Sequence, residues 1–270
     1  MTEVLREFGR RMDTAIDKQE FIDYAKDCMY VLDLGAGTGK MARELSSKWH
    51  VHVDAVDQQF KGDCTVQAGV SYYGMSILEF LTTYTEKQYN CIILSAILHE
   101  LSNFELAQLS ILLPKVMAPS CRILIREPFY DDYLGPVDWR NKDKLAEIIK
   151  SVVPEEKLNE YLRAVKLSTG RPCPVEWGDE AVDWANLAFT YSYGEENWSR
   201  EIHEYRYARS LNWCKDFFNF DTRPYTGFEV ICRKDEAYRK HFADIGYPED
   251  VFNMLRYTGM TVIFDYKSAD

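Results

Sequence analysis

The stretch VLDLGAGTG, residues 31–39, places three glycines directly after a short apolar run. A run of this length that ends in glycines is typical of a buried parallel strand entering a tight turn. Glycine lets the backbone turn sharply and approach a ligand closely, and a helix starting near residue 40 would present free N–H groups to that ligand. A carboxylate, Asp57, follows the next predicted strand at 50–56, where it could accept hydrogen bonds from ribose hydroxyls. The order of these features predicts a nucleoside-binding turn.

The spacing of the glycines distinguishes this turn from two other classes of nucleotide-binding loop. It is G-x-G-x-G at 35–39, whereas dinucleotide-binding turns have G-x-G-x-x-G and phosphate-binding loops have G-x-x-x-x-G-K-[ST]. Asp33 lies in the predicted strand, two residues before the first glycine. A carboxylate there would repel a pyrophosphate but would suit a cationic ligand that carries an amino group.

Strand and helix patterns alternate from residue 30 to residue 128. Strands are predicted at 30–34, 50–56, 70–73, 91–94 and 122–126, and helices at 40–48, 77–83 and 104–117. Such alternation predicts an α/β fold, in which a parallel sheet carries helices on both faces. Strand patterns return at 228–232 and 260–266.

Four segments are expected along the chain. They are N-terminal helices at 1–29, a nucleoside-binding core at 30–130, a helical insertion at 131–222 and strands that complete the sheet at 223–270. The insertion is rich in aromatic side chains and includes a long helical pattern from 195 to 218. We expect it to form a cap on the substrate side, with Tyr191 among the residues that line the acceptor pocket.

The glycine-rich segment at 31–39, followed by an acid that ends the second strand, resembles the class I S-adenosylmethionine-dependent methyltransferases. The resemblance covers residues 30–128 and implies a three-layer, Rossmann-like sheet with a helical cap inserted after the fifth strand. It also implies S-adenosylmethionine as the cofactor. In that family's pattern, the methionine part of the cofactor would contact Asp33, Gly35, Ala36 and Gly37. The ribose would contact Asp57, and the adenine would contact Gln58, Met75 and Ser76. Ser95 would border the methyl donor. The family often has an acid beside the adenine, where this chain has Met75 and Ser76.

Ionisable residues follow the fourth and fifth predicted strands, at the edge where open α/β sheets bind ligands. His99 and Glu100 come soon after the strand at 91–94 and are the candidate catalytic residues, and an imidazole there could remove a proton from a methyl acceptor. The alternative is a structural His99 that forms a hydrogen bond within the following turn. Arg126 and Glu127 end the fifth strand, where they would anchor a substrate or form a salt bridge.

The amino-acid composition argues against several classes of binding partner, namely nucleic acid, membrane and metal ions. The 270 residues carry 32 basic and 43 acidic side chains, and the formal net charge of −11 argues against broad contact with nucleic acid. The longest uncharged apolar stretch, near 89–98, is shorter than the ~20 residues that span a membrane, and the start of the chain lacks the apolar block of a signal peptide. A cytoplasmic protein is therefore expected. The seven cysteines form no C-x-x-C pair and His50 and His52 have no evident third ligand, so no metal site is expected.

We therefore expect an enzyme that uses S-adenosylmethionine to methylate an oxygen or nitrogen of a small molecule. The sequence leaves its oligomeric state open. Alignment of the acceptor with the reactive donor would supply most of the catalysis. One alternative is methylation of a nucleobase, in RNA for example, or of a protein side chain; another is a non-catalytic partner subunit that binds the cofactor. The segment SAILHE at 95–100 lacks the N/D-P-P-Y/F motif of enzymes that methylate amino groups of adenine, cytosine or glutamine.

Overall fold

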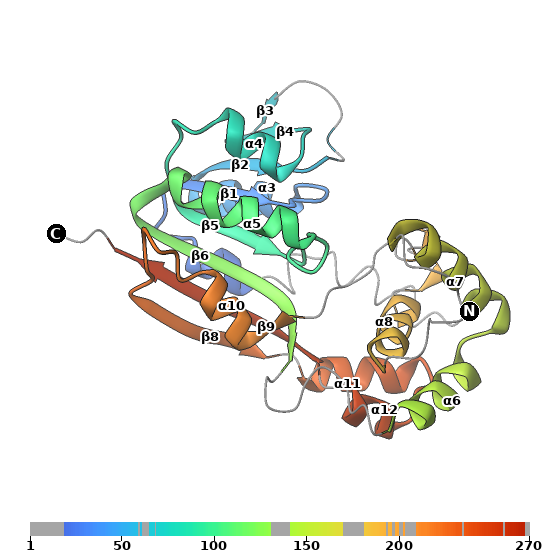
Figure 1. Ribbon diagram of the computed structural model, residues 1–270. Helices are drawn as coiled ribbons and strands as arrows, with labels where there is room; N and C mark the ends of the chain where they lie inside the picture. Colours follow the sequence, from blue (N-terminus) through green and yellow to red (C-terminus); the bar gives the residue numbers. More distant parts are fainter. Residues whose placement is uncertain are drawn as a thin grey trace. The chain divides into compact units, whose positions relative to one another are not determined.

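Two compact units make up the chain in the computed structural model (Figure 1). The first, the sheet unit, comprises residues 14–127, 212–233 and 260–270. The second, the helical unit, comprises residues 1–13, 128–211 and 234–259. The structure describes residues 19–58, 60, 65–67, 69–130, 141–169, 181–192, 194–195, 198–199, 202, 209–233, 235–255 and 257–267. The expected helix before residue 19 and the segment at 131–140 lie outside the described residues.

One mixed sheet forms the centre of the sheet unit, which confirms the predicted α/β fold. Its described strands are β1 (Tyr30–Leu34), β2 (His52–Val56), β3 (Thr65–Gln67), β4 (Val70–Tyr73), β5 (Tyr89–Ser95), β6 (Met117–Tyr130), β8 (Gly227–Arg233) and β9 (Tyr257–Tyr266). They follow the spatial order β3-β4-β2-β1-β5-β6-β9-β8. Neighbours from β4 to β6 are parallel, whereas β3 is antiparallel to β4 and β8 is antiparallel to β9. In the helical unit, β7 (Arg209–Ser210) pairs with the last two residues of β6.

The carboxyl ends of β1, β2 and β5 meet at one edge of this sheet. The register pairs Leu34 of β1 with Val56 of β2 and with Leu94 of β5. The chain order reverses at β1, because β2 lies on one side of it and β5 on the other. Open α/β sheets bind their ligands at such a switch point, outside the carboxyl ends of the strands.

Helices cover both faces of the sheet. The described helices of the sheet unit are α2 (Gln19–Tyr24), α3 (Lys40–Trp49), α4 (Ile77–Thr83), α5 (Asn103–Leu112), the 3₁₀ helix η2 (Leu113–Val116) and α10 (Leu211–Phe217). Phe21 of α2 and Leu45 of α3 are buried in one core with Val31 of β1. On the other face α4 lies against the sheet (Figure 1). The rings of Phe80 and Tyr73 pack edge to face there, with centroids 4.8 Å apart. Burial on both faces explains why the central strands β1 and β5 are mainly apolar.

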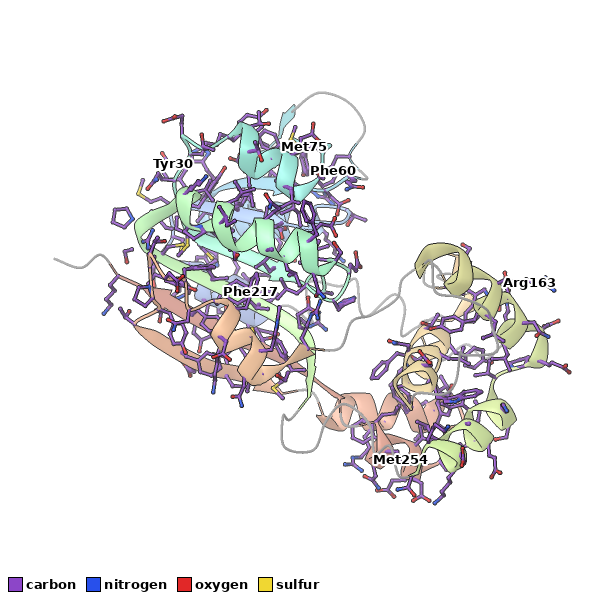
Figure 2. The ribbon with its side chains drawn as sticks, viewed as in Figure 1. Tyr30, Phe60, Met75, Arg163, Phe217 and Met254 are labelled. Atoms are coloured by element: carbon purple, nitrogen blue, oxygen red, sulfur yellow. The ribbon has the colours of Figure 1, made fainter. Side chains whose placement is uncertain are left out.

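The helical unit has a core of its own. Its described helices are α6 (Lys142–Val152), α7 (Glu155–Thr169), α8 (Ala181–Ser192), α11 (Asp235–Asp244) and α12 (Glu249–Met254). Buried side chains from all five helices meet in this core, among them Leu145, Tyr161, Trp184, Phe242 and Met254, the last of which is labelled in Figure 2. No described helix in either unit is long and apolar enough to cross a membrane.

The structure differs from the expected element boundaries at three places. Residues 234–259 contribute α11 and α12 to the helical core, where the sequence pattern suggested only strands that complete the sheet. The predicted helix at 195–218 is replaced at its end by the short β7 and α10, because pairing of β7 with β6 is a long-range contact that helical periodicity does not record. β6 is longer than the predicted 122–126. It tolerates Pro119 because that residue lies in an irregularity of the β5–β6 register, where no ladder hydrogen bond is needed from it.

Candidate active site

The glycine turn leaves β1 at its carboxyl end. Gly35, Gly37 and Gly39 have φ angles of 76°, 56° and 70°, a region that L side chains rarely adopt. The N–H groups of Gly35 and Ala36 both donate to the Val56 carbonyl, at 2.9 and 3.1 Å, so the turn is held against the end of β2. The helix α3 begins directly after Gly39.

The three glycines differ in what surrounds them. A Cβ on Gly35 would lie 2.9 Å from Ile97 Cγ1, and a Cβ on Gly39 would lie 2.6 Å from the Tyr72 ring. A Cβ on Gly37 would meet no heavy atom of the described residues within 4 Å. Gly35 and Gly39 are therefore needed for close packing as well as for their φ angles. Gly37 faces open space, where a ligand could approach the backbone.

Asp57 lies beside this open part of the turn. Its Oδ2 accepts the Gly37 N–H at 2.7 Å, and its own N–H donates to the Tyr73 carbonyl at 3.1 Å. The carboxylate remains partly exposed at the sheet edge, and Gln58, which follows it, is exposed. The two parts of the predicted nucleoside site, separated by 20 residues in sequence, are thus in direct contact. Asp33, in β1, is 1% exposed.

Met75 and Ser76 follow β4 at this same end of the strands. The Ser76 hydroxyl accepts the Glu79 N–H at 3.1 Å and so caps α4. Met75 is partly exposed. Ser76 therefore has a structural role, and the expected contacts of this pair with an adenine stay predictions.

The end of β5 carries a second unusual turn. Ala96 has a φ of 57°, and its N–H donates to the Arg126 carbonyl at 2.8 Å. A non-glycine residue in this region costs about 1 kcal/mol or more and is held there by its surroundings. Ser95, just before it, is 7% exposed, and its hydroxyl has no hydrogen-bond partner among the described residues. A buried hydroxyl at the sheet edge that lacks a protein partner suits contact with a ligand.

Glu127 of β6 holds the turn that follows β5. Its Oε1 accepts the N–H groups of Ile97 and Leu98 at 2.7 and 2.6 Å. Its Oε2 lies 2.6 Å from His99 Nδ1. Glu127 and His99 are 3% and 6% exposed, so this is a buried carboxylate with protein donors on both oxygens. Such pairing offsets the large cost of burying the charge.

The contact with Glu127 sets the chemistry of His99. An ionised carboxylate only accepts hydrogen bonds, so Nδ1 must carry the proton that it donates. In the neutral imidazole with the proton on Nδ1, Nε2 carries the lone pair and is the nitrogen able to act as a base. A base oriented by a third group through a hydrogen bond is a recurring feature of enzyme active sites.

The other residues predicted at this edge have different surroundings. Glu100 is exposed, and its Oε1 lies 3.9 Å from His99 Nε2, which is too long for a hydrogen bond. Arg126 is 7% exposed and lies in β6, where it pairs with Ser95 at the end of β5. Both oxygens of Glu127 accept hydrogen bonds from the protein, which supports a positioning role, and its expected contact with a substrate stays a prediction.

Tyr191 belongs to the helical unit and lies at the end of α8. Its ring packs edge to face against Trp198, with centroids 6.2 Å apart. Burial and the nearby Glu195 carboxylate raise the pKa of the Tyr191 hydroxyl. Its expected contact with a substrate stays a prediction.

Sequence reasoning missed two of the contacts that build the site. The first is the pairing of Glu127 with His99, and the second is the Val56 carbonyl that holds the glycine turn. A signal for the first was present, because a histidine and an acid follow two strands that are neighbours in the predicted sheet. No signal in the sequence distinguishes Val56, since it contributes through its backbone.

Comparisons with known proteins bear on the fold. No protein-family model matches the chain, and no curated protein matches it by sequence. Among solved structures, it is similar to the cyclopropane synthase MmaA2 from Mycobacterium tuberculosis, with a TM-score of 0.50 and 9% identity over 93% of this chain and 84% of that one. It is also similar to a SAM-dependent methyltransferase from Archaeoglobus fulgidus, with a TM-score of 0.48 and 14% identity over 97% of this chain and 94% of that one.

At these identities the likeness concerns the fold alone. The strand order agrees with this fold. The order of the parallel strands along the chain reverses at β1, and the sheet ends in the antiparallel pair β9 and β8. The chain therefore has the Rossmann-like fold of the class I S-adenosylmethionine-dependent methyltransferases.

Proposed function

We propose that this protein binds S-adenosylmethionine at the carboxyl edge of β1, β2 and β5 and transfers its methyl group to an oxygen or nitrogen of a small molecule. The observation that carries the proposal is the meeting of two features at one sheet edge. One is the glycine turn held by Asp57 through the Gly37 N–H, and the other is the buried pair of His99 and Glu127. Together they offer a nucleoside site and an oriented base.

The residues at this edge fit the proposed cofactor. Asp57, partly exposed beside the turn, suits the ribose hydroxyls, and Gly37 leaves the backbone accessible. Asp33 would favour the amino group and the positive charge of the methionine part, since opposite charges attract strongly at a buried site. The Ser95 hydroxyl, buried and without a described protein partner, would face the methyl donor.

When bound, S-adenosylmethionine would supply a methyl group on a cationic sulfur. His99 Nε2 would take the proton that the acceptor hydroxyl or amine loses on methylation. Glu127 would hold the imidazole in the tautomer with the proton on Nδ1 and would stabilise the imidazolium that results. A general base positioned in this way contributes about 10²–10⁴ in rate, and alignment of the reactants contributes the remainder.

Calorimetry tests the first step of this proposal. Titration with S-adenosylmethionine and with S-adenosylhomocysteine should give saturable binding, and titration with a nicotinamide dinucleotide should give none. Tight dinucleotide binding without a response to the sulfonium compound would exclude the proposed cofactor. An Asp57→Ala variant should lose most of the affinity, because it removes the carboxylate that faces the ribose.

Release of S-adenosylhomocysteine tests the second step. A panel of phenols, carboxylic acids and amines should include acceptors that are methylated in a time-dependent manner. Cofactor binding without turnover on any of these, or on RNA or a protein extract, would favour the non-catalytic partner subunit over the enzyme.

A further inference from the structure

A pocket lies at the edge of the sheet opposite to the glycine turn, where β1, β2, β4 and β5 begin. Its volume is about 430 Å³, which is within the range of small-molecule sites in proteins. The residues that line this amino-edge pocket include Tyr30, His52, Asp54, Lys87 and Tyr89. All of its lining residues belong to the sheet unit, so the pocket is a feature of that unit alone.

Two aromatic rings lie side by side in the pocket lining. Tyr30, which Figure 2 labels, begins β1, and His52 begins β2 directly opposite it in the register. The two rings stack with their centroids 5.8 Å apart and an angle of 18° between their planes. Tyr30 is 48% exposed, and His52 is also exposed. Exposed aromatic rings beside a pocket suit a planar aromatic ligand, because such a ligand can stack on them.

An ion pair lies next to these rings. Asp54 Oδ2 accepts a hydrogen bond from Lys87 Nζ at 2.7 Å and another from the Tyr89 hydroxyl at 2.6 Å. Lys87 Nζ also donates to the Tyr73 hydroxyl at 2.6 Å. Burial and the Asp54 carboxylate raise the pKa of the Tyr89 hydroxyl, which therefore keeps the proton that it donates. These hydrogen bonds fix the positions of the carboxylate and of the ammonium group.

The ion pair keeps one acceptor and one donor for a ligand. Asp54 Oδ1 accepts no hydrogen bond from a described residue, and the Asp54 side chain is 14% exposed. Lys87 has three N–H groups, and described residues accept only two of them. A complementary ligand has a donor beside an acceptor. The amino group and the adjacent ring nitrogen of an aminopyrimidine or aminopurine have this arrangement, on the edge by which proteins read an unpaired base.

We propose that the amino-edge pocket binds a nucleobase or nucleoside of the cytosine or adenine type. The ring of the base stacks on Tyr30, its amino group donates to Asp54 Oδ1, and its ring nitrogen accepts from Lys87. The ligand is a small molecule and not a nucleic acid, because a formal net charge of −11 repels a chain of phosphates. This proposal does not depend on the proposed methyltransferase activity, since the pocket contains none of the residues assigned to that site.

Saturation-transfer NMR on the full-length protein with 4-aminopyrimidine tests the proposal. We expect saturable binding with a dissociation constant on the order of 1 mM, as is usual for so small a probe. The matched control is 4-methylpyrimidine, which keeps the ring and its nitrogen but lacks the amino donor, so it should bind about tenfold more weakly. Equal binding of the two compounds would overturn the proposal, as would an absence of saturable binding of 4-aminopyrimidine.

Three variants test whether the probe binds in this pocket. Tyr30→Ser removes the stacking ring at a half-exposed position and should weaken the binding of 4-aminopyrimidine at least about fivefold. Phe104→Ser is the matched control, because Phe104 of α5 is an aromatic residue that is 72% exposed outside the pocket lining, and it should bind the probe as the unmodified protein does. Asp57→Ala, beside the glycine turn, should also keep this affinity. Unchanged binding in Tyr30→Ser would overturn the proposal, and a loss in Asp57→Ala would place the probe at the other edge and overturn it too.

Cytidine and a single-stranded oligocytidylate distinguish the two sources of such a base. Cytidine should compete with 4-aminopyrimidine, and the oligonucleotide should bind no more tightly per base than cytidine. Failure of cytidine to compete would overturn the proposal. Much tighter binding of the oligonucleotide, falling steeply as salt is added, would assign the pocket to nucleic acid and overturn the small-molecule assignment.

Discussion

At the level of single residues, the 2.6 Å contact between Glu127 and His99 Nδ1 has two functions. It keeps a buried carboxylate paired, and it determines which imidazole nitrogen bears the proton. The same carboxylate accepts two backbone N–H groups of the turn after β5, so the position of His99 depends on a residue of the neighbouring strand β6. Geometry and protonation state are thus controlled by a single side chain.

Replacement of His99 by alanine should separate catalysis from cofactor binding. We expect the turnover number to fall by about 10²–10⁴, because the general base is lost, while the dissociation constant of S-adenosylmethionine changes little. Steady-state kinetics and calorimetry on the same preparation provide the two measurements. The control is Glu100→Gln, an exposed position 3.9 Å from Nε2, which should retain most activity. An equal loss of cofactor affinity in His99→Ala would indicate a structural histidine.

Glu127→Gln should impair the same step for a different reason. The amide can still accept the Ile97 and Leu98 N–H groups through its oxygen, but its NH₂ group would then face His99 Nδ1. Nδ1 would have to accept, so the proton would move to Nε2 and the base would lose its lone pair. We expect a fall in turnover of about 10²–10⁴ with a nearly unchanged unfolding midpoint. Nitrogen NMR of the imidazole should report the change of tautomer, and an unchanged tautomer would contradict this account.

At the level of elements, the glycine turn combines a backbone requirement with a space requirement. Alanine at position 37 keeps a φ near 56° only at a cost of about 1–2 kcal/mol in the free energy of unfolding. Its methyl group would also occupy the open space beside Asp57. We therefore expect Gly37→Ala to lower both stability and affinity for S-adenosylmethionine, measured by chemical denaturation and calorimetry.

A matched glycine in the helical unit separates the effect on stability from the effect on cofactor affinity. Gly246 has a φ of 99°, and a Cβ there would also meet no heavy atom of the described residues within 4 Å. Gly246→Ala should therefore show a similar loss of stability with no loss of cofactor affinity. A comparable loss of affinity in both variants would mean that the effect at position 37 comes from destabilisation alone.

At the level of the whole molecule, stability should depend on pH through a buried histidine. His241 of α11 is 4% exposed, and its Nε2 lies 3.1 Å from the Ser192 carbonyl. Burial lowers the pKa of His241 to about 4, against an ordinary value near 6.5. The unfolded chain therefore binds a proton between these values that the folded protein excludes.

It follows that stability is fully present above pH 6.5 and is lost as the pH falls toward 4. The shift corresponds to roughly 3 kcal/mol from this residue. Urea unfolding at several pH values should show the decline, and His241→Gln, which keeps a donor for the Ser192 carbonyl, should remove most of it. An identical decline in the variant would assign the pH dependence to other groups.

Local sequence was sufficient for those elements whose periodicity records burial. β1, β2, β4 and the helix α4 lie within a few residues of their predicted positions, because apolar runs and helical stripes follow directly from which side chains are buried. The glycine turn was also predictable from its three closely spaced glycines, because glycine readily adopts the positive φ angles that such a turn has. The contact of Asp57 with this turn follows from parallel strands that end at a common edge.

Local patterns along the chain were enough to predict the α/β class, the glycine turn and the set of polar residues at the carboxyl edge. The partners of those residues came only from the folded chain. Glu127 pairs with His99, and residues 234–259 join the helical core. This division arises because strand and helix patterns reflect neighbours a few positions apart. Hydrogen-bond partners and shared cores depend on which distant segments the folded chain brings together.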